Sequence, residues 1–385
     1  MTRSAAPNGM MPHETTAQHL HPQAMETENT MDKKPLLGHT EAELKDIARS
    51  LGMPAFTGGQ IARWLYVQHA RSIDEMTNIS KRNRELLGAE YCVGAESPLV
   101  CQRSKDGTVK YLFPTESGKT IETVFIPEAD RATLCVSCQI GCKMNCVFCQ
   151  TGKQGFEGQL TTRDILNQIY SLPERERLTN IVFMGQGEPM DNLDNVLKAT
   201  EILTAPYAYA WSPRRITVSS VGIRTKLRRF LDESECHMAI SLHTPIPEQR
   251  AQMMPAEKGM PIRDIVALMR QYFPSRRKRS TPAEGETASH QRRLTFEYTV
   301  FAGTNDTPTH LKEIVRLLRD LDCRVNLIRF HQIPGSPLRG ATEEQMEHIC
   351  DYLNRNGIPT TIRASRGQDI DAACGLLNTK NQESK

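Results

Sequence analysis

One loop, residues 135–149, holds the residues of this sequence best suited to chemistry, because five of its fifteen positions are cysteine. Three of them, Cys142, Cys146 and Cys149, form the pattern C-x3-C-x2-C. Three thiolates on so short a loop can hold three irons of a [4Fe–4S] cube and leave the fourth iron without a protein ligand. Such an iron can chelate S-adenosylmethionine and deliver an electron to its sulfonium, which gives a 5′-deoxyadenosyl radical able to abstract unactivated hydrogen atoms.

A structural zinc site is the alternative interpretation, because the loop also contains two C-x2-C pairs, Cys135 with Cys138 and Cys146 with Cys149. The seven residues between the pairs are a short spacing for a zinc ribbon, and Cys142 would be left over. An iron and sulfide assay on anaerobically purified protein distinguishes the two interpretations. Stoichiometric zinc without sulfide would exclude the cluster.

The composition is that of an ordinary globular protein of 385 residues, with 38% hydrophobic and 24% charged residues. No apolar run approaches the length of a membrane span, and the N-terminus lacks the apolar region of a signal peptide. Eleven cysteines without an export signal indicate a reducing compartment, so we expect a cytoplasmic protein whose cysteines bind metal or react as thiols. The net charge of +3 permits nucleic-acid binding without requiring it.

The first third of the chain is predicted to precede the core. Residues 1–33 lack periodicity and are predicted to be a disordered tail. Residues 34–95 are predicted to form a small helical accessory domain that could hold a polymeric substrate, with helices at 40–51, 58–66 and 81–87. Residues 96–132 are predicted to be a β-hairpin and linker, because Asp106-Gly107 lies between alternating segments.

The core is expected at 133–377, where apolar strands alternate with amphipathic helices. Strands are predicted at 180–184, 215–219, 238–242, 294–301, 324–330 and 359–362. Helices are predicted at 162–172, 193–203, 224–231, 262–272, 309–321 and 343–356. Repeated β-α units with right-handed crossovers predict an α/β fold, a partial (βα)6 barrel similar to a TIM barrel. Residues 274–293 read as a basic insertion loop, and residues 378–385 as a short tail.

Several polar residues fall where the predicted strands end, which is where a parallel barrel collects its chemistry. Gly187 would let the backbone approach a ligand, and the carboxylate of Glu188 could accept hydrogen bonds from an ammonium group. Further candidates at strand ends are Ser219, Ser241, Leu242, His243 and His331. Cys374, after the last strand, and Cys135 could form a redox pair at the barrel mouth that exchanges between thiols and a disulfide.

The sequence resembles the RlmN/Cfr family of radical-SAM RNA methyltransferases from about residue 36 to residue 377, and the RlmN branch most closely. The shared motifs are Ile121-Glu-Thr-Val, Cys135-Val-Ser-x-Gln-x-Gly-Cys142, Cys142-x3-Cys146-x-Phe-Cys149, Gln154-Gly-Phe156, Met184-Gly-x-Gly-Glu-Pro189, Ser241-Leu-His243, Gly303-x-Asn-Asp306 and Asp369-Ile-Asp-Ala-Ala-Cys-Gly375. So many motifs in the same order make a chance match negligible.

The resemblance implies a mechanism that uses two S-adenosylmethionine molecules per turnover. Cys374 would take a methyl group from the first, and the radical from the second would abstract a hydrogen atom from that methyl group. The resulting carbon would add to carbon-2 of an adenine, Glu122 would accept a proton, and Cys135 would attack Cys374 to release the product with a transient disulfide. The implied cofactor-binding residues are Gly187, Glu188, Ser219, Ser241, Leu242, His243 and His331; the implied cluster ligands are Cys142, Cys146 and Cys149.

The implied partners are 23S rRNA, some tRNAs at the adenosine 3′ of the anticodon, and an electron donor such as flavodoxin or ferredoxin, with a monomeric enzyme. This sequence has Cys138 where relatives usually have serine, and His331 where many have asparagine. Two alternatives stay open: methylation of carbon-8 of adenine, as in the Cfr branch, and a zinc-stabilised RNA-binding protein without catalysis. The helical domain and the basic 274–293 loop are the segments expected to contact RNA.

Overall fold

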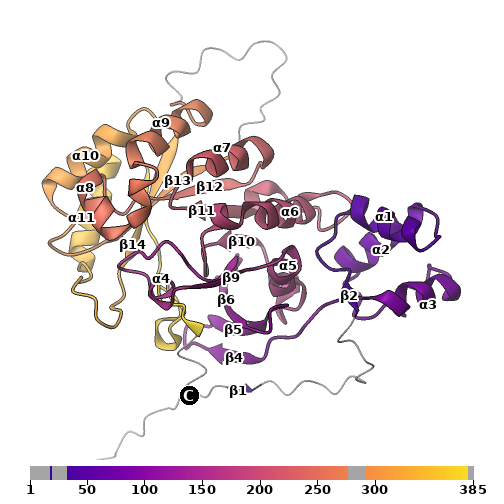
Figure 1. Ribbon diagram of the computed structural model, residues 1–385. Coiled ribbons are helices and arrows are strands. Elements are labelled where there is room, and N and C mark those ends of the chain that lie inside the picture. The colour runs from indigo at the N-terminus through magenta and orange to yellow at the C-terminus, as the bar shows by residue number, and fades with distance from the viewer. Residues whose placement is uncertain (1–17, 20–32, 276–291, 380–385) are drawn as a thin grey trace, which may run out of the picture.

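The computed structural model describes residues 18–19, 33–275 and 292–379, and Figure 1 shows their arrangement. The predictions for the rest of the 1–33 tail, for 276–291 of the basic insertion and for 380–385 lie outside the described residues. Gln18–His19 is a two-residue strand, β1, which pairs with β4. No helix among the described residues is long and apolar enough to cross a membrane.

Three helices form a module at one side of the molecule: α1 (Glu41–Ser50), α2 (Phe56–Tyr66) and α3 (Lys81–Glu90). Thr40 begins α1 through a capping box: the Thr40 side chain accepts from the backbone amide of Glu43, and the Glu43 side chain accepts from the backbone amide of Thr40. A short parallel ladder of β2 (Lys34–Pro35) and β3 (Tyr91–Cys92) closes the module. The three helices expected from the sequence are therefore present.

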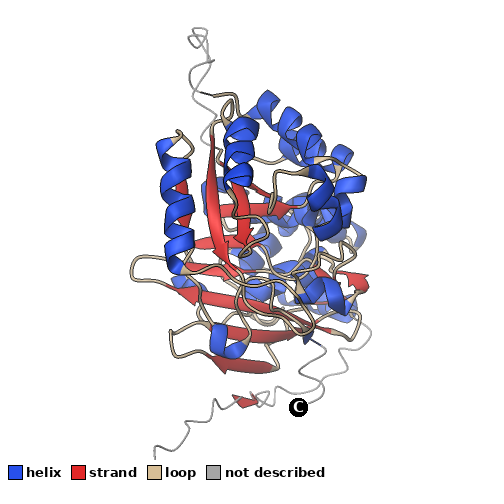
Figure 2. Ribbon diagram, turned by 90° about the vertical axis from the view of Figure 1, so that its left-hand side faces the viewer, coloured by secondary structure: helices blue, strands red, loops and turns tan. Residues whose placement is uncertain are grey.

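A single sheet of eleven strands runs through the rest of the molecule, in the order β1-β4-β5-β6-β7-β10-β11-β12-β13-β14-β15. Its first part is an antiparallel meander of β4 (Val100–Arg103), β5 (Val109–Pro114), β6 (Thr120–Pro127) and β7 (Ala132–Cys135). The hairpin at Asp106-Gly107 joins β4 to β5, as predicted. Figure 2 shows that this meander continues into the strands of the barrel.

From β7 onward every neighbouring pair of strands in the barrel is parallel. The strands are β10 (Asn180–Phe183), β11 (Ile216–Ser220), β12 (His237–Ser241), β13 (Leu294–Val300), β14 (Cys323–Arg329) and β15 (Thr360–Ile362). The connecting helices are α5 (Thr162–Tyr170), α6 (Leu193–Thr204), α7 (Arg224–Glu233), α9 (Ile262–Tyr272), α10 (Pro308–Leu318) and α11 (Glu343–Arg355). Six β-α units followed by a seventh strand confirm the predicted partial (βα)6 barrel.

Two short helices were missing from the predicted elements, α4 (Gln150–Gln154) and α8 (Pro247–Met253). The boundaries of two predicted segments also differ. Arg292, assigned to the insertion loop, donates to the backbone oxygens of Leu231 and Cys236 and leads directly into β13. Asn378 and Thr379, assigned to the terminal tail, are buried and belong to the core.

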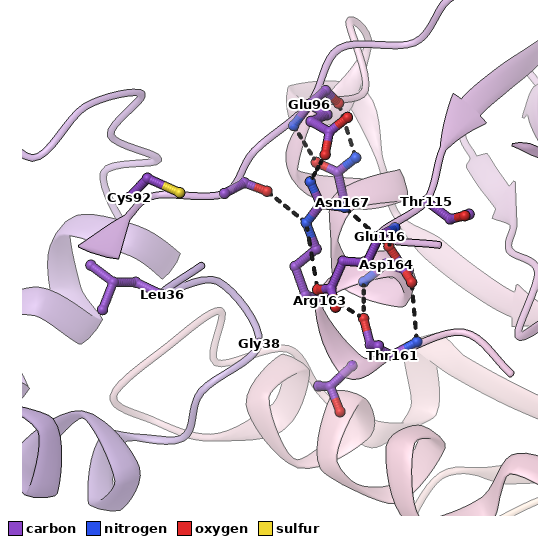
Figure 3. A network of polar contacts seen from close by, with 12 residues as sticks. Leu36, Gly38, Cys92, Glu96, Thr115, Glu116, Thr161, Arg163, Asp164 and Asn167 are labelled. Carbon is purple, nitrogen blue, oxygen red and sulfur yellow. Dashed lines mark hydrogen bonds and ion pairs between the residues drawn. The ribbon is translucent and has the colours of Figure 1, made fainter. Parts of the chain in front are cut away.

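The accessory module is attached to the barrel through α5, as Figure 3 shows. The Arg163 side chain donates to the Gly94 backbone oxygen (2.7 Å) and pairs with Glu96, both at the exit of the module. The Asn167 side chain donates to the Glu96 oxygen and accepts from its amide. Arg163 is buried and directs two of its donors at this one connecting segment, which fixes the orientation of the module relative to the barrel.

Candidate active site

A cavity lies at the carboxyl ends of the barrel strands, where the sequence places its polar strand endings. We call it the cofactor cavity. The site candidates that line it are Cys142, Cys146, Cys149, Gly187, Glu188, Ser219, Ser241, His243 and Cys374. Segments separated by more than 200 positions along the chain thus converge on one space. Of the remaining candidates, Glu122, Cys135, Leu242 and His331 are absent from its lining.

The three cysteines of the C-x3-C-x2-C loop stand together on one wall of the cofactor cavity. Burial raises the pKa of Cys142 to about 12 and also raises those of Cys146 and Cys149, and negative charge on neighbouring thiols adds to the shift. Soft sulfur donors in a buried pocket therefore need the positive charge of bound iron to ionise. This donor set fits a [4Fe–4S] cluster.

The same loop does not have the geometry of a single-ion site. In the described part of the chain, no group of three or more His, Cys, Asp or Glu side chains is arranged to hold one metal ion. A zinc site requires its ligands to surround one point, whereas each cysteine of a cube binds a different iron.

The Gly185–Pro189 turn after β10 brings its backbone close to the cysteine loop. Gly187 has φ +104°, and a Cβ there would lie 2.5 Å from the Cβ of Gln139, so the position requires glycine. The Glu188 carboxylate is buried and accepts from Ser220 Oγ (2.7 Å) and from the backbone amides of Met190 and Val221. Glu188 thus ties the turn to the end of β11, and a carboxylate with about four lone-pair positions can accept one further hydrogen bond from a ligand.

At the ends of β11 and β12, successive side chains point to opposite faces of the sheet, so only some of them line the cavity. Ser219 lines the cofactor cavity, whereas Ser220 does not and donates its hydroxyl to the Glu188 carboxylate. Leu242 is completely buried and outside the cavity, so its side chain packs in the core. The predicted run 241–243 therefore contributes only Ser241 and His243 to the lining.

His243 is held neutral and in one orientation. Its ring Nδ1 accepts from the Thr299 amide (3.0 Å), which leaves the proton on Nε2. Burial, with the nearby Arg250 cation, lowers the pKa of His243 to about 3. The ring also packs edge-on against Phe148, with centroids 4.7 Å apart. His243 can therefore act as a hydrogen-bond donor at all physiological pH values.

Arg250, on the unpredicted helix α8, supports this wall from behind. Its side chain is completely buried and pairs with Glu257. It donates to the backbone oxygens of Val221 (3.0 Å), which follows β11, and of Ser241 (2.8 Å) and Leu242 (3.2 Å) at the end of β12. One signal in the sequence could have indicated this helix: Pro247 stands at its first position, which is typical of a helix start.

The segment that carries Cys374 is held at both ends. On one side, the Asp369 carboxylate accepts from Ser104 and from the Lys105 amide at the tip of the β4–β5 hairpin. On the other side, the Gln150 amide donates to the Gly375 oxygen and Thr151 Oγ1 donates to the Leu377 oxygen, both at 2.8 Å. Because Gln150 directly follows the last cluster cysteine, Cys374 is held beside the cysteine loop.

Cys135 and Cys374 are neighbours but are not linked. All eleven cysteines are free thiols, so the predicted disulfide is not present in this structure. Cys135 ends β7 and packs with Ala372 and Ile370 of the Cys374 segment. Burial raises the pKa of Cys135 to about 12; the charge of Cys374 adds to this shift, while the Arg363 guanidinium opposes it. As a buried thiol of high pKa, Cys135 is a weak nucleophile in this state.

Glu122 lies outside the cavity, on β6 in the interior. It is completely buried, its Oε1 pairs with Lys110 Nζ (3.0 Å) and its Oε2 accepts from the Asn378 amide (2.6 Å). Burial raises the pKa of Glu122, against the opposing effects of Lys110 and of the Asn378 amide. The resemblance implied that Glu122 accepts a proton; in this structure its carboxylate lies against Asn378, four residues after Cys374.

A second cavity lies inside the barrel, and we call it the arginine cavity. Its lining has six arginines, Arg131, Arg293, Arg324, Arg329, Arg363 and Arg366, and two carboxylates, Glu128 and Glu297. His331 lines this cavity, and its Nε2 is hydrogen-bonded to Ser365 Oγ. Cys374 lines both cavities. An excess of positive charge suits a cavity for a phosphate-bearing ligand.

Known proteins are similar to this chain both in two separate segments and over nearly its whole length. Residues 136–290 match the radical SAM superfamily, and residues 34–93 match the ribosomal RNA large subunit methyltransferase N-terminal domain. A probable dual-specificity RNA methyltransferase RlmN of Bacteroides fragilis is 57% identical over 353 residues, 92% of this chain and 98% of the relative. The RlmN of Marinobacter nauticus is 38% identical over 90% of this chain and 93% of its own length.

A solved structure agrees. The crystal structure of a radical SAM methyltransferase from Sphaerobacter thermophilus superimposes with a TM-score of 0.80 at 36% identity and covers 89% of this chain and 99% of that one. The barrel and the cysteine loop thus define a radical SAM enzyme, and this superfamily implies a [4Fe–4S] cluster and S-adenosylmethionine. More specifically, the chain belongs to the RlmN family of RNA methyltransferases.

Proposed function

We propose that the protein methylates carbon-2 of an adenosine in 23S rRNA and of the adenosine 3′ of the anticodon in some tRNAs. The observation that carries this proposal is the position of Cys374. Its side chain lines both the cofactor cavity and the arginine cavity, so it can receive a carbon from one side and pass it to the other. The proposal rests further on the names of the relatives, which are dual-specificity RNA methyltransferases.

Cys142, Cys146 and Cys149 would hold the cluster, and Gly187, Glu188, Ser219, Ser241 and His243 would contact S-adenosylmethionine. When bound, these groups supply the methyl group, an electron and a 5′-deoxyadenosyl radical that activates the methyl carbon. Leu242 would contribute only through its backbone, and His331 would contact a ligand from the arginine cavity. The use of two S-adenosylmethionine molecules per turnover is part of the proposal.

Cys374 would carry the carbon. Its sulfur would displace the thioether of a sulfonium and so take the methyl group, with loss of the thiol proton. The radical would then remove one hydrogen atom from this methyl group, the carbon would bond to carbon-2 of the adenine, and the one electron in excess would return to the cluster. Glu122 would accept the proton lost from carbon-2, which requires the Asn378 backbone to move off its carboxylate. Cys135 would attack the sulfur of Cys374 with loss of its own proton. The sulfur–carbon bond would break, the departing carbon would take up a proton and become the methyl group, and a Cys135–Cys374 disulfide would be left for a thiol reductant to open.

Two substitutions and one product analysis test the function. Cys374→Ala should abolish the modified nucleoside, and Cys135→Ala should accumulate protein covalently linked to RNA, because release needs the second thiol. Mass spectrometry of RNA from a complemented deletion strain should find 2-methyladenosine. Finding 8-methyladenosine would replace carbon-2 with carbon-8, and an active Cys374→Ala variant would refute the covalent route.

We propose further that the accessory module holds the RNA. Its helices expose apolar and basic side chains, including Phe56, which is 66% exposed, and Lys81 and Arg82 at the start of α3. The double charge reversal Lys81→Glu with Arg82→Glu should weaken RNA binding and leave methyl loading of Cys374 unchanged. The matched control reverses two other exposed residues instead, Lys312 of α10 and Arg319, which directly follows α10. Equal RNA affinity for both double variants would contradict a role for the module.

The remaining proposed partners concern electron delivery and assembly. A flavodoxin- or ferredoxin-type protein would reduce the cluster, and the enzyme would act as a monomer. Light scattering during gel filtration tests the oligomeric state, and cluster reduction by purified flavodoxin or ferredoxin, followed by visible absorption, tests the donor.

A further inference from the structure

Five residues line both cavities and therefore separate them: Met184, Glu297, Ile328, Arg363 and Cys374. One of these five residues, Glu297 on β13, has no role in the proposed function. It is 4% exposed, and its Oε1 accepts from Asn326 Nδ2 at 3.0 Å. Its Oε2 is buried without a hydrogen-bond partner. Buried carboxylate oxygens are normally paired, so an unpaired one at a ligand cavity indicates that a ligand pairs with it.

Neighbouring contacts fix the direction of this free oxygen. Thr361 Oγ1 donates to Asn326 Oδ1 (2.9 Å), so the Asn326 amide group must face Glu297 Oε1. The other oxygen then remains for the cavities. The charge of Arg363 opposes the effect of burial, which raises the pKa of Glu297. In the ionised form, which the Arg363 charge favours, both carboxylate oxygens can only accept hydrogen bonds, so the site calls for a ligand that donates.

The target base is the donor that fits this position. The cysteine loop and the Gly187–Glu188 turn belong to the cofactor cavity, so a base that takes its carbon from Cys374 must reach the sulfur from the arginine cavity. Met184 and Ile328 offer it an apolar surface, and the arginines suit its phosphates. Adenine has one exocyclic donor, the 6-amino group, on the same edge of the base as carbon-2. A flipped base is commonly identified by hydrogen bonds on this edge.

Building on the proposed function, we propose that Glu297 selects adenine as the target base, with its Oε2 accepting a hydrogen bond from the exocyclic 6-amino group. A purine that carries an oxygen at position 6 would place an acceptor against an acceptor. Loss of a hydrogen bond to a charged group is expected to lower kcat/KM roughly 10- to 100-fold.

The first test uses the unaltered holoenzyme, so it does not depend on the folding of a variant. Three anticodon stem-loop RNAs carry adenosine, purine riboside or inosine at the target nucleotide. Purine riboside lacks the 6-amino group, and inosine replaces it with oxygen, while both keep hydrogen at carbon-2. Adenosine should exceed both analogues by roughly 10- to 100-fold in kcat/KM. Equal modification of adenosine and purine riboside would overturn the inference.

The second test changes the residue. The Glu297→Gln side chain can donate to a 6-oxo group, so the ratio of inosine to adenosine modification should rise roughly 10-fold or more over that of the wild type. Glu297→Asp, the conservative control, should be slower and still prefer adenosine. Binding constants for the same RNAs give a readout independent of turnover and should change in parallel. If Glu297 had a purely structural role, Glu297→Gln would lower the modification of the adenosine RNA and of the inosine RNA by the same factor. That result would also overturn the inference.

Methylation of Cys374 in the absence of RNA distinguishes base selection by Glu297 from a role of Glu297 in cofactor binding. Intact-protein mass spectrometry without RNA should show the same methyl group on Cys374 in wild type and in Glu297→Gln. Loss of loading in the variant would assign Glu297 to the cofactor and refute base selection. Failure of the wild type to modify adenosine in any RNA would instead refute the proposed function, so the two failures are distinguishable.

Discussion

Replacing Lys110 with methionine tests whether the buried ion pair with Glu122 controls the charge of that carboxylate. Lys110 Nζ and Glu122 Oε1 are 3.0 Å apart, and the side chains are 5% and 0% exposed. Methionine keeps the length and the apolar stem of the side chain but removes the charge. Leaving one buried partner unpaired typically costs about 3–5 kcal/mol.

The corresponding change in melting temperature follows from the size of the chain. At roughly 2.1 cal/mol/K per residue, unfolding a chain of 385 residues has an entropy near 0.8 kcal/mol/K. A loss of about 3–5 kcal/mol should therefore lower Tm by about 4–6 °C near pH 8. Differential scanning calorimetry of the anaerobic holoenzyme measures this shift.

The pH dependence identifies the cause. Without Lys110, burial raises the pKa of Glu122 further, so the folded variant binds a proton more readily than the unfolded chain, whose pKa is near 4.5. Stability is then lost as pH rises above 4.5, and the difference in Tm between wild type and variant should be smaller at pH 5.5 than at pH 8.

A nearby surface pair provides the control. Lys119 and Glu157 lie 2.9 Å apart, with side chains 45% and 27% exposed, so Lys119→Met should change Tm by at most about 1 °C. An equal Tm loss for Lys110→Met at both pH values would refute the electrostatic reasoning. A loss no greater than that of Lys119→Met would refute the buried pair itself.

Three further predictions concern the cofactor cavity. Gly187→Ala should weaken S-adenosylmethionine binding, measured by equilibrium dialysis, because its Cβ would collide with Gln139, whereas Gly88→Ala, with open space around it, should bind normally. Arg250→Met should lower Tm by several degrees, because it removes three hydrogen bonds to backbone oxygens and leaves the buried Glu257 without its ion-pair partner. A Tm equal to that of wild type would contradict the supporting role of Arg250. His243 should contribute stability that is lost as pH falls from 6.5 toward 3, since its folded pKa lies below its unfolded one; Tm profiles of wild type and His243→Gln that run parallel over this range would exclude the effect.

The sequence predicts the barrel well because its elements repeat. Each β-α unit carries its own periodic apolar pattern, and six such patterns in succession support one another. Helix α8 shows where this reasoning ends, because it has seven residues and only Arg250 and Met253 are buried. A buried arginine looks like a surface arginine until the carbonyl groups around it are known, so its contribution to the cavity wall could not be foreseen.

The sequence predicts which residues belong to the site, but it does not predict their burial or their contacts. The motifs identify Glu188, Cys374 and the cluster cysteines, and the structure brings these to one cavity. The burial of Glu122 depends on the register of β5 against β6, which places Lys110 opposite Val124 and on the same face as Glu122. No local pattern encodes that pairing. The same limitation hid Glu297, which lies in the middle of β13 and belongs to no motif.

The attachment of the accessory module has a consequence for the length of RNA that the enzyme can use. Arg163 and Asn167 hold the module exit at Gly94 and Glu96, so the module and Cys374 keep one fixed separation. If the module grips RNA as proposed, affinity should rise in a single step when a transcript becomes long enough to span both sites. A gradual increase with every added nucleotide would instead indicate a module that follows its substrate.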